Sequence, residues 1–331
     1  MTDILETAAY GGAGWSPRTA SLRQEIGKVW GVCGLGTEWS PLKAVLLHRP
    51  GPELDELSDP DGVQMLAPLD ASRARQQHDA LARTYRDAGV VVQYVEPAAC
   101  GERRFAYSRT KTPPPNLMFI ADLMFVTPEG AILGRPASTV RAGEERFVAR
   151  RLAGLGVPIL RSVRGKGTFE GADALWIDPQ TALVATGLRT NAEGAEQVAS
   201  LLREMGVEVI QVGLPYGAMH LMGQVRFADR DLAITWPGRV PYAAVEALRA
   251  RGYTVLFIPD QDEAGRGMAL NFVTLGPRRI LMPTGNPITQ SFYEGVGITC
   301  QVVEVDELLK AAGGIGCLTG ILQRELGKGA W

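Results

Sequence analysis

Residues 167–215, GTFEGADALWIDPQTALVATGLRTNAEGAEQVASLLREMGVEVIQVGLP, contain one complete folding unit. GTFEGADALWID and TALVATGL predict two short strands that turn at Pro179 and Gln180. Asn191 then precedes AEGAEQVASLLREM, whose apolar residues fall at helical spacing, so we expect this asparagine to cap a helix. Gly206 stands where a helix commonly ends on glycine, and VEVIQVGLP predicts a third strand. The order is strand–strand–helix–strand.

The same order of elements recurs, in pattern rather than in identity, about every fifty residues on both sides of this unit. The predicted hairpins are residues 116–136, 218–237 and 268–285; the helices after them are residues 143–154, 242–252 and 289–297; the closing strands are residues 157–163, 254–260 and 300–306. The first copy has a strand at 42–50, a helix at 71–88 and a strand at 90–97, with an irregular insertion between its parts.

Five such units predict a ring. One unit cannot bury both faces of its small sheet, whereas five units around a central axis can, with the helices outside. A doubly wound α/β sheet also alternates strands and helices, but it uses one strand per helix, and here a hairpin precedes each helix. We therefore predict an α/β fold, a five-bladed propeller that forms a single domain over residues 1–331, with residues 1–35 as an N-terminal extension.

Composition excludes several classes of protein. The 34 Lys and Arg nearly balance the 36 Asp and Glu, so nucleic acid is not an expected partner. No apolar run reaches the roughly 18 residues of a membrane span, and the N-terminus does not resemble a secretory signal. Four cysteines are too sparse for a disulfide framework, which predicts free thiols and a cytoplasmic protein. With three histidines and no CxxC pair, we expect no metal and no cofactor.

Polar residues interrupt the apolar strands at matching places in successive units. They fall at or near strand ends, and in a ring such positions converge on the central axis. A cysteine, a histidine and carboxylates brought together there would form a nucleophilic site. The residues concerned are Asn116, Asp122, Glu170, Asp173, His220 and Cys317.

Each of these residues also has a structural interpretation. A lone cysteine is most often a small buried hydrophobe, His220 alone could be a core histidine, and Glu170 with Asp173 could form an acidic turn. Cys317 differs because AAGGIG precedes it and LTGILQREL after it predicts a helix, so that the thiol would lie near a helix N-terminus that favours a thiolate. Asp122 interrupts an apolar strand, where a carboxylate is costly unless it is paired or used. Its candidate partners are Arg135 and Arg141.

The ordered motifs resemble the guanidine-modifying (pentein) superfamily, which includes arginine deiminase, dimethylarginine dimethylaminohydrolase and the amidinotransferases. In chain order the motifs are FIAD, RP, FEGAD, LRTNAEGAEQV, MHL and the Gly-rich segment that carries the last cysteine. They span about residues 115–322 and are most similar to the dimethylarginine hydrolases. The resemblance implies a five-bladed α/β propeller with Cys317 as nucleophile, His220 as general acid/base and Glu170 as the carboxylate partner of the histidine. It implies Asp122 as a substrate-binding acid.

One departure bears on the substrate. Arginine deiminases keep a second acid two residues after the histidine. Here that position is Met222, and the dimethylarginine hydrolases have no acid there either. One carboxylate fewer weakens selection for a cation. The whole chain also resembles the branch of the superfamily that hydrolyses 2-nitroimidazole, which would give imidazol-2-one and nitrite through a covalent intermediate on the cysteine. Further substrate-binding candidates are Asn116, Asp173, Arg135 and Met222.

Three alternatives remain open. A guanidine hydrolase of the arginine deiminase or dimethylarginine dimethylaminohydrolase type would need arginines for an amino-acid head group, which Arg103, Arg104, Arg109 and Arg141 could supply. An amidinotransferase would pass the intermediate to an amine instead of water. A non-catalytic propeller of the ribosome anti-association type would bind a large partner, but it predicts neither the cysteine nor the histidine. The expected partner is a small-molecule substrate, and a homo-oligomer is not excluded.

Overall fold

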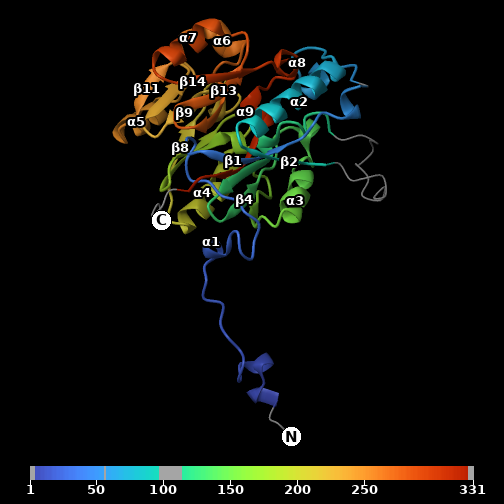
Figure 1. Ribbon diagram of the computed structural model, residues 1–331, viewed down its shortest axis with the longest axis vertical. Coiled ribbons are helices and arrows are strands. Elements are labelled where there is room, and N and C mark those ends of the chain that lie inside the picture. The colour runs from blue at the N-terminus through green and yellow to red at the C-terminus, as the bar shows by residue number, and fades with distance from the viewer. Residues whose placement is uncertain (1–3, 56, 97–113, 327–331) are drawn as a thin grey trace.

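The computed structural model describes residues 4–55, 57–96 and 114–326, and it contains five three-stranded sheets with helices packed outside them (Figure 1). In each sheet the first strand runs antiparallel to the central strand and the third runs parallel to it. Successive sheets touch one another, and the fifth sheet touches the first through β12 and β1, so the sheets close into a ring. The predicted five-bladed α/β propeller is confirmed.

The strands are short, as the turn-rich sequence predicts. The first sheet consists of β15 (Gly320–Arg324), β1 (Leu42–Leu47) and β2 (Val91–Tyr94), and the second of β3 (Met124–Thr127), β4 (Gly130–Leu133) and β5 (Ile159–Ser162). The third has β6 (Ala174–Asp178), β7 (Thr181–Thr186) and β8 (Glu208–Gly213), and the fourth β9 (Val225–Asp229), β10 (Leu232–Thr235) and β11 (Thr254–Phe257). The fifth has β12 (Val273–Gly276), β13 (Arg279–Pro283) and β14 (Thr299–Val303).

One helix connects the second and third strands of each sheet, and shorter helices lie elsewhere in the described chain. The α-helices are α1 (Leu22–Glu25), α2 (Ala71–Asp87), α3 (Glu145–Gly154), α4 (Ala192–Glu204), α5 (Tyr242–Ala250), α6 (Gln261–Gly265), α7 (Pro287–Gly295), α8 (Asp306–Leu309) and α9 (Ile315–Leu318). The 3₁₀ turns are η1 (Ile4–Glu6), η2 (Ala8–Tyr10), η3 (Pro52–Leu54), η4 (Asp61–Val63), η5 (Ile120–Leu123), η6 (Thr139–Arg141), η7 (Gly171–Asp173) and η8 (Leu221–Gly223).

The third blade forms as the sequence predicts. The Asn191 side chain accepts a hydrogen bond from the backbone N–H of Gly194 and so caps α4. Gly206 has φ 78°, the left-handed conformation that ends a helix at little steric cost to glycine. Trp176, a buried residue of the third blade, stacks on Phe125 of the second blade at 5.6 Å between ring centroids. The indole N–H of Trp176 donates to the carbonyl of Val126. These contacts join the two blades.

The C-terminal segment differs from the sequence prediction. LTGILQREL was expected to be helical, but Gly320–Arg324 is strand β15, paired antiparallel with β1. The first unit has no hairpin of its own, so the edge of β1 is free for a strand from elsewhere in the chain. Residues 320–324 alternate between buried and half-buried positions, the two-residue period of a strand. The end of the chain therefore completes the first blade and closes the ring.

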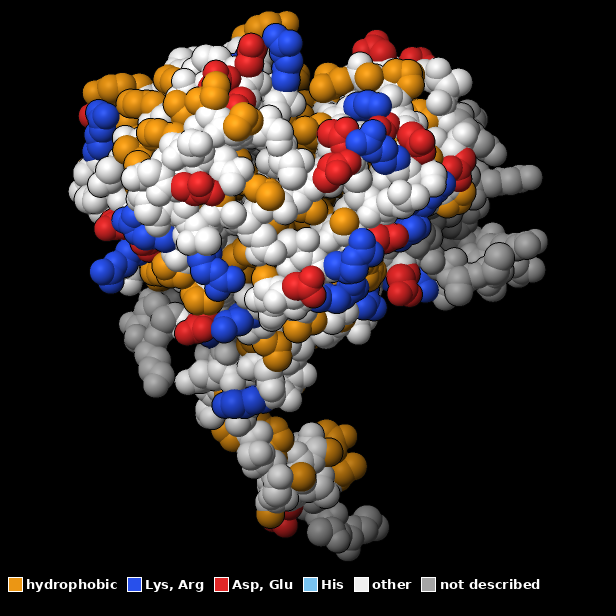
Figure 2. Space-filling model, turned by 45° about the horizontal axis from the view of Figure 1, so that its top comes forward, with side chains coloured by type: hydrophobic (Ala, Val, Ile, Leu, Met, Phe, Trp, Pro, Cys, Tyr) orange, Lys and Arg blue, Asp and Glu red, His pale blue; other side chains and the backbone are white. Residues whose placement is uncertain are grey.

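The N-terminal segment projects away from the propeller (Figures 1 and 2). Apolar side chains along it are exposed, among them Ile4, Leu5, Tyr10 and Trp15. On the propeller face shown in Figure 2, positive and negative side chains are interspersed. None of the helices among the described residues combines the length and the apolar character needed to cross a membrane.

Replacing Asn191 by alanine should lower the free energy of unfolding by about 1–2 kcal/mol, because α4 loses its N-cap. The same side chain also holds the backbone of Thr168 and Lys166 at the entrance to β6. Denaturant unfolding of the purified variant measures the loss. Asn191→Asp keeps the acceptor oxygen and should retain most of the stability; equal losses in both variants would show that capping is not the cause.

Candidate active site

Three short turns at equivalent places in consecutive blades carry the central polar residues. Each turn stands directly before the first strand of its sheet: η5 before β3, η7 before β6 and η8 before β9. Asp122 lies within η5, Glu170 is the N-cap residue of η7 and His220 is the N-cap residue of η8. Asp122 was predicted to lie inside a strand, which is wrong: it lies in the turn directly before the strand. The repeated turn is what brings the three side chains together.

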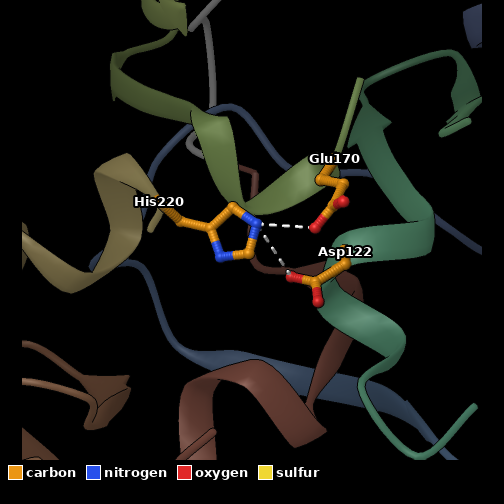
Figure 3. Close-up of side chains that lie close together, drawn as sticks. All are labelled: Asp122, Glu170 and His220. Carbon is orange, nitrogen blue, oxygen red and sulfur yellow. Dashed lines mark hydrogen bonds and ion pairs between the residues drawn. The ribbon is translucent and has the colours of Figure 1, made fainter. Parts of the chain in front are cut away.

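The histidine directs one ring nitrogen towards both carboxylates (Figure 3). Its Nε2 is 2.7 Å from Oε2 of Glu170 and 3.8 Å from Oδ1 of Asp122. All three residues are buried, with His220 4% and Glu170 0% exposed. Oδ1 of Asp122 makes no hydrogen bond within the described part of the chain, so it is an acceptor left over for another donor.

A buried arginine neutralises much of the negative charge. Arg141, at the end of η6, places Nη1 2.5 Å from Asp122 Oδ2 and 3.5 Å from Glu170 Oε2, and Nη2 2.8 Å from Glu144. Arg189 approaches Glu170 Oε1 at 3.7 Å. Of the two predicted partners for Asp122, Arg141 is therefore the one that binds it. Arg189 and Glu144 were not identified from the sequence, although Arg189 stands within the LRTNAEGAEQV motif.

These contacts fix the protonation states. Burial opposes the charge on His220, but Asp122, Asp173 and the hydrogen-bonded Glu170 together raise its pKa to about 9. Burial likewise opposes the charge on Glu170, but His220, Arg141 and Arg189 outweigh it and lower its pKa to about 2. The pair is thus an imidazolium and a carboxylate at neutral pH, and the histidine has a proton to donate.

Cys317 is held by an asparagine from the neighbouring blade. Its backbone N–H donates to Oδ1 of Asn271 at 3.2 Å, and Nδ2 of Asn271 donates to Sγ of Cys317 at 3.1 Å. The sequence analysis missed Asn271. Its signal was present, since it interrupts the apolar run MALNFVT as Asn116 and Asp122 interrupt theirs.

The expected helix-end activation of the thiol does not occur. Cys317 is the third residue of α9, which has only four residues, too few for a substantial dipole. Burial raises the pKa of the thiol and the negative charge of Asp122 raises it further; hydrogen bonds from Asn271 and from the backbone of Gly314, and the charge of Arg226, lower it but do not outweigh burial. The unliganded site therefore favours a neutral thiol beside an imidazolium.

Cys317 and His220 face the same two adjoining cavities. The smaller has a volume of about 20 Å³, room for little more than one water molecule, and Asp122, Arg141 and Arg189 also line it. The larger has a volume of about 340 Å³ and is walled mainly by apolar residues. Those residues include Leu66, Met219, Met222, Trp236 and Leu270.

The other predicted site residues divide into two groups. Asn116 lines the small cavity, where its amide donates to the carbonyl of Val63, and Met222 lines the larger one. Asp173 lines neither; it accepts hydrogen bonds from the Thr190 hydroxyl and from the backbone N–H of Leu221, the residue after the histidine.

Arg135 also lines neither cavity, because its guanidinium donates to the carbonyl of Gly167. Cys100, Arg103, Arg104 and Arg109 lie outside the described residues.

Ligand atoms of Asp122, Glu170 and His220 lie within 4.8 Å of one another, a spacing that could suit a metal ion. Arg141 is ion-paired with both carboxylates, and the histidine is protonated at neutral pH. A cation would therefore compete with a guanidinium and a proton that these groups already hold.

Comparison with known proteins places this geometry in a family. The family model for arginine deiminase matches residues 102–241. A dimethylarginine dimethylaminohydrolase from Streptomyces coelicolor is 28% identical over 289 residues, covering 86% of this chain and 99% of the relative. Over most of its length the chain is similar to proteins of the guanidine-modifying (pentein) superfamily. The predicted resemblance is confirmed, and the prediction of a hydrolase acting on C–N bonds is confirmed at the level of that family.

Two solved structures share the pentein fold. Dimethylarginine dimethylaminohydrolase from Pseudomonas aeruginosa, in complex with citrulline, superposes with a TM-score of 0.68 at 22% identity, covering 84% of this chain and 98% of the other. An amidinotransferase of the saxitoxin pathway from Microseira wollei gives 0.71 at 16% identity, covering 89% and 98%.

Glu170→Gln should lower the pKa of His220 by at least ~1 unit, because the substitution removes an adjacent negative charge. The three histidines make this measurable by NMR titration of the imidazole protons. Glu204→Gln, which alters an exposed carboxylate, is the matched control and should leave that pKa near 9. An unchanged His220 pKa in Glu170→Gln would contradict the assigned pairing.

The same pKa predicts how stability depends on pH. The folded-state pKa of His220 is raised from 6.5 to about 9, so its stabilising contribution is complete below pH 6.5 and is lost as pH rises through 9. The free energy of unfolding should therefore fall across this interval more steeply in the wild type than in His220→Gln. Parallel pH profiles of the two proteins would contradict the charged state assigned to the pair.

Proposed function

We propose that this protein is a cysteine-dependent hydrolase that removes nitrite from 2-nitroimidazole, with Cys317 as nucleophile, His220 as general acid/base and Glu170 as the partner of the histidine. The family chemistry requires a planar carbon bonded to nitrogens. C2 of 2-nitroimidazole lies between two ring nitrogens and carries nitrite, an anion that leaves readily. The proposal narrows the family activity to one substrate class, a compact neutral azole.

The charge of the small cavity carries this proposal. One carboxylate, Asp122, faces it, and Arg141 already pairs with that carboxylate. Arg189 and the protonated His220 line the same cavity. A guanidinium ion bound there would meet several positive charges and lose a charge-assisted contact worth roughly 1.5–3 kcal/mol. A neutral azole has no such penalty.

One acceptor suits an azole N–H. Oδ1 of Asp122 makes no hydrogen bond among the described residues, and it can accept the single ring N–H of the substrate. The second ring nitrogen is itself an acceptor. The small cavity holds only the edge of the ring, and the remainder extends into the adjoining larger cavity; Met219 lines both. Phe119 also lines the small cavity, and a side-chain carbon at Gly313 would meet its ring at 2.3 Å. Glycine at 313 therefore lets the chain pass the aromatic ring closely.

The first half of the proposed reaction forms a covalent intermediate. The Cys317 sulfur adds to C2 while its proton passes to the free ring nitrogen, which gives a tetrahedral adduct. The C2–NO₂ bond then breaks with its electron pair on nitrite, which leaves as the anion. A 2-thioimidazolium remains bonded to the cysteine, and its positive charge lowers the pKa of the adjacent His220, which releases its proton to solvent and is left neutral.

The second half restores the enzyme. Neutral His220 takes a proton from water as the water oxygen bonds to C2. The C2–S bond then breaks with its electrons on sulfur, and the proton of the new hydroxyl group returns to sulfur. The products are imidazol-2-one, nitrite and the proton released to solvent, and the thiol and imidazolium of the starting state are regenerated. Glu170 holds the imidazole orientation throughout, through its bond to Nε2.

A guanidine hydrolase is the second candidate, because the relatives include a dimethylarginine dimethylaminohydrolase and the arginine deiminase family model. Arg239, which lines the larger cavity, could meet a substrate carboxylate. An amidinotransferase would use the same nucleophile with an amine as acceptor. A non-catalytic propeller gives no reason for an asparagine to hold a cysteine thiol beside a protonated histidine.

Cys317→Ser should reduce turnover to less than about 1% of the wild-type rate while the protein stays folded, because a serine hydroxyl ionises far less readily than a thiol. Cys33→Ser and Cys300→Ser are the controls; burial raises the pKa of both thiols to about 11, and neither lines the catalytic cavities. Retained turnover in Cys317→Ser, with circular dichroism unchanged, would remove the cysteine from the mechanism.

Purified protein should release nitrite from 2-nitroimidazole and should not release citrulline from arginine. Assays of nitrite, citrulline and amines in parallel, with methylarginines and agmatine as further substrates, test this directly. Met222→Asp should not improve nitrite release, since it adds an unpaired charge to a mainly apolar cavity. The protein would belong with the guanidine hydrolases if it formed citrulline from arginine with a kcat/KM above about 10⁴ M⁻¹s⁻¹, the low end for ordinary enzymes, and released no nitrite from 2-nitroimidazole.

A further inference from the structure

A third cavity lies within the ring, between the blades. Its volume is about 60 Å³, several times the space that one water molecule needs. Residues from all five sheets line it, including Val126, Leu175, Phe227, Val273 and Ile321. Neither Cys317 nor His220 lines it, so it is distinct from the two catalytic cavities.

Two buried arginines face this cavity, and their charges are not fully balanced. Arg226 is 8% exposed and Arg324 2%. The third ionisable residue in the lining is Glu38, which is partly exposed and accepts a hydrogen bond from the backbone of Trp176. With Glu38 ionised, the lining carries a net charge of about +1. A buried charge without a counter-charge is costly.

Hydrogen-bond donors on both arginines remain unused within the described part of the chain. Nε and Nη2 of Arg226 have no partner there, and neither has Nε of Arg324. Nη1 of Arg324 is engaged with the carbonyls of Ser40 and Thr274, which anchors that guanidinium to the lining. No ion pair among the described residues joins Glu38 to either arginine. Two fixed cations with donors to spare at one cavity match the needs of a small anion.

We propose that this axial cavity binds one monovalent anion of halide size, chloride in the cell, between Arg226 and Arg324. A single negative charge balances the lining, and the volume accommodates a halide together with water molecules. The walls other than the arginines and Glu38 offer mainly carbon, so a larger, strongly hydrated anion such as sulfate would lose more hydration than the two arginines replace.

The proposed anion site adjoins the backbone next to Cys317. A side-chain carbon at Gly316 would meet Nη2 of Arg226 at 1.7 Å, so the guanidinium packs against the backbone next to Cys317. Asn271, which binds the cysteine sulfur, is within contact of the same glycine. An anion that holds Arg226 in place therefore also supports the segment that presents the thiol. This inference does not depend on which substrate the enzyme uses.

Crystals soaked in sodium bromide test the site directly. Diffraction at the bromine absorption edge should show an anomalous peak within hydrogen-bond distance of Arg226 and Arg324. In solution, bromide or chloride should raise Tm by roughly 2 °C or more over sodium gluconate at equal ionic strength. A halide-independent Tm together with a cavity that shows no anomalous peak would overturn the proposal and leave water as the occupant.

Variants separate this site from general salt effects. Arg226→Met should abolish the halide dependence of Tm, whereas Arg266→Met, which removes an exposed arginine at the C-cap of α6, should retain it. Glu38→Gln removes the competing negative charge and should lower the halide concentration needed for half of the Tm rise. If Arg226→Met does not fold, the bromide peak and the Glu38→Gln titration still decide; a weaker halide response in Glu38→Gln would count against the site.

Discussion

The site is organised around the imidazolium of His220, whose Nε2 faces the carboxylates of both Glu170 and Asp122. Burying these three ionised side chains is costly, and the structure tolerates it because Arg141 contacts Asp122, Glu144 and Glu170 together. Each member depends on the others: without Arg141 two carboxylates would repel each other, and without Glu170 the histidine would have no fixed orientation. The charges are therefore retained as a set, in a fixed geometry beside the cysteine.

The ring produces this geometry from a few short segments of sequence. Each blade enters its first strand through a short turn, and three such turns in consecutive blades deliver one polar side chain each to the same point. The closing strand β15 has a comparable role for the nucleophile. Because Gly320–Arg324 is paired with β1, the four-residue turn that carries Cys317 is tied at its C-terminal side to the first blade and through Asn271 to the fifth. Ring closure and nucleophile placement are thus one structural event.

Local patterns made much of this predictable from the sequence. The hairpins that precede the helices of the last four units indicated the propeller, and the Asn191 cap and Gly206 terminus appear at the predicted residues. Long-range pairing was not predictable in the same way. The sequence of β15 alone favours a helix, and the segment becomes a strand because β1, far earlier in the chain, has a free edge. The paired residues are 282 positions apart at Leu42 and Arg324 (324 − 42) and 274 apart at Leu46 and Gly320 (320 − 46). Arg135 and Arg141 were equivalent as partners of Asp122 until the fold placed one of them beside Gly167.

The protonation states of the site also constrain what it can accept. The raised pKa of His220 means that the histidine already carries its proton, and the raised pKa of Cys317 means that the sulfur keeps its own. An imidazolium has no lone pair to take the thiol proton when the sulfur attacks, and in the proposed reaction the substrate receives it. A guanidinium has no free lone pair for this purpose, whereas the second ring nitrogen of a neutral azole does. Under the proposed chemistry, the substrate activates its own nucleophile, and the network that holds the imidazolium selects for a neutral substrate.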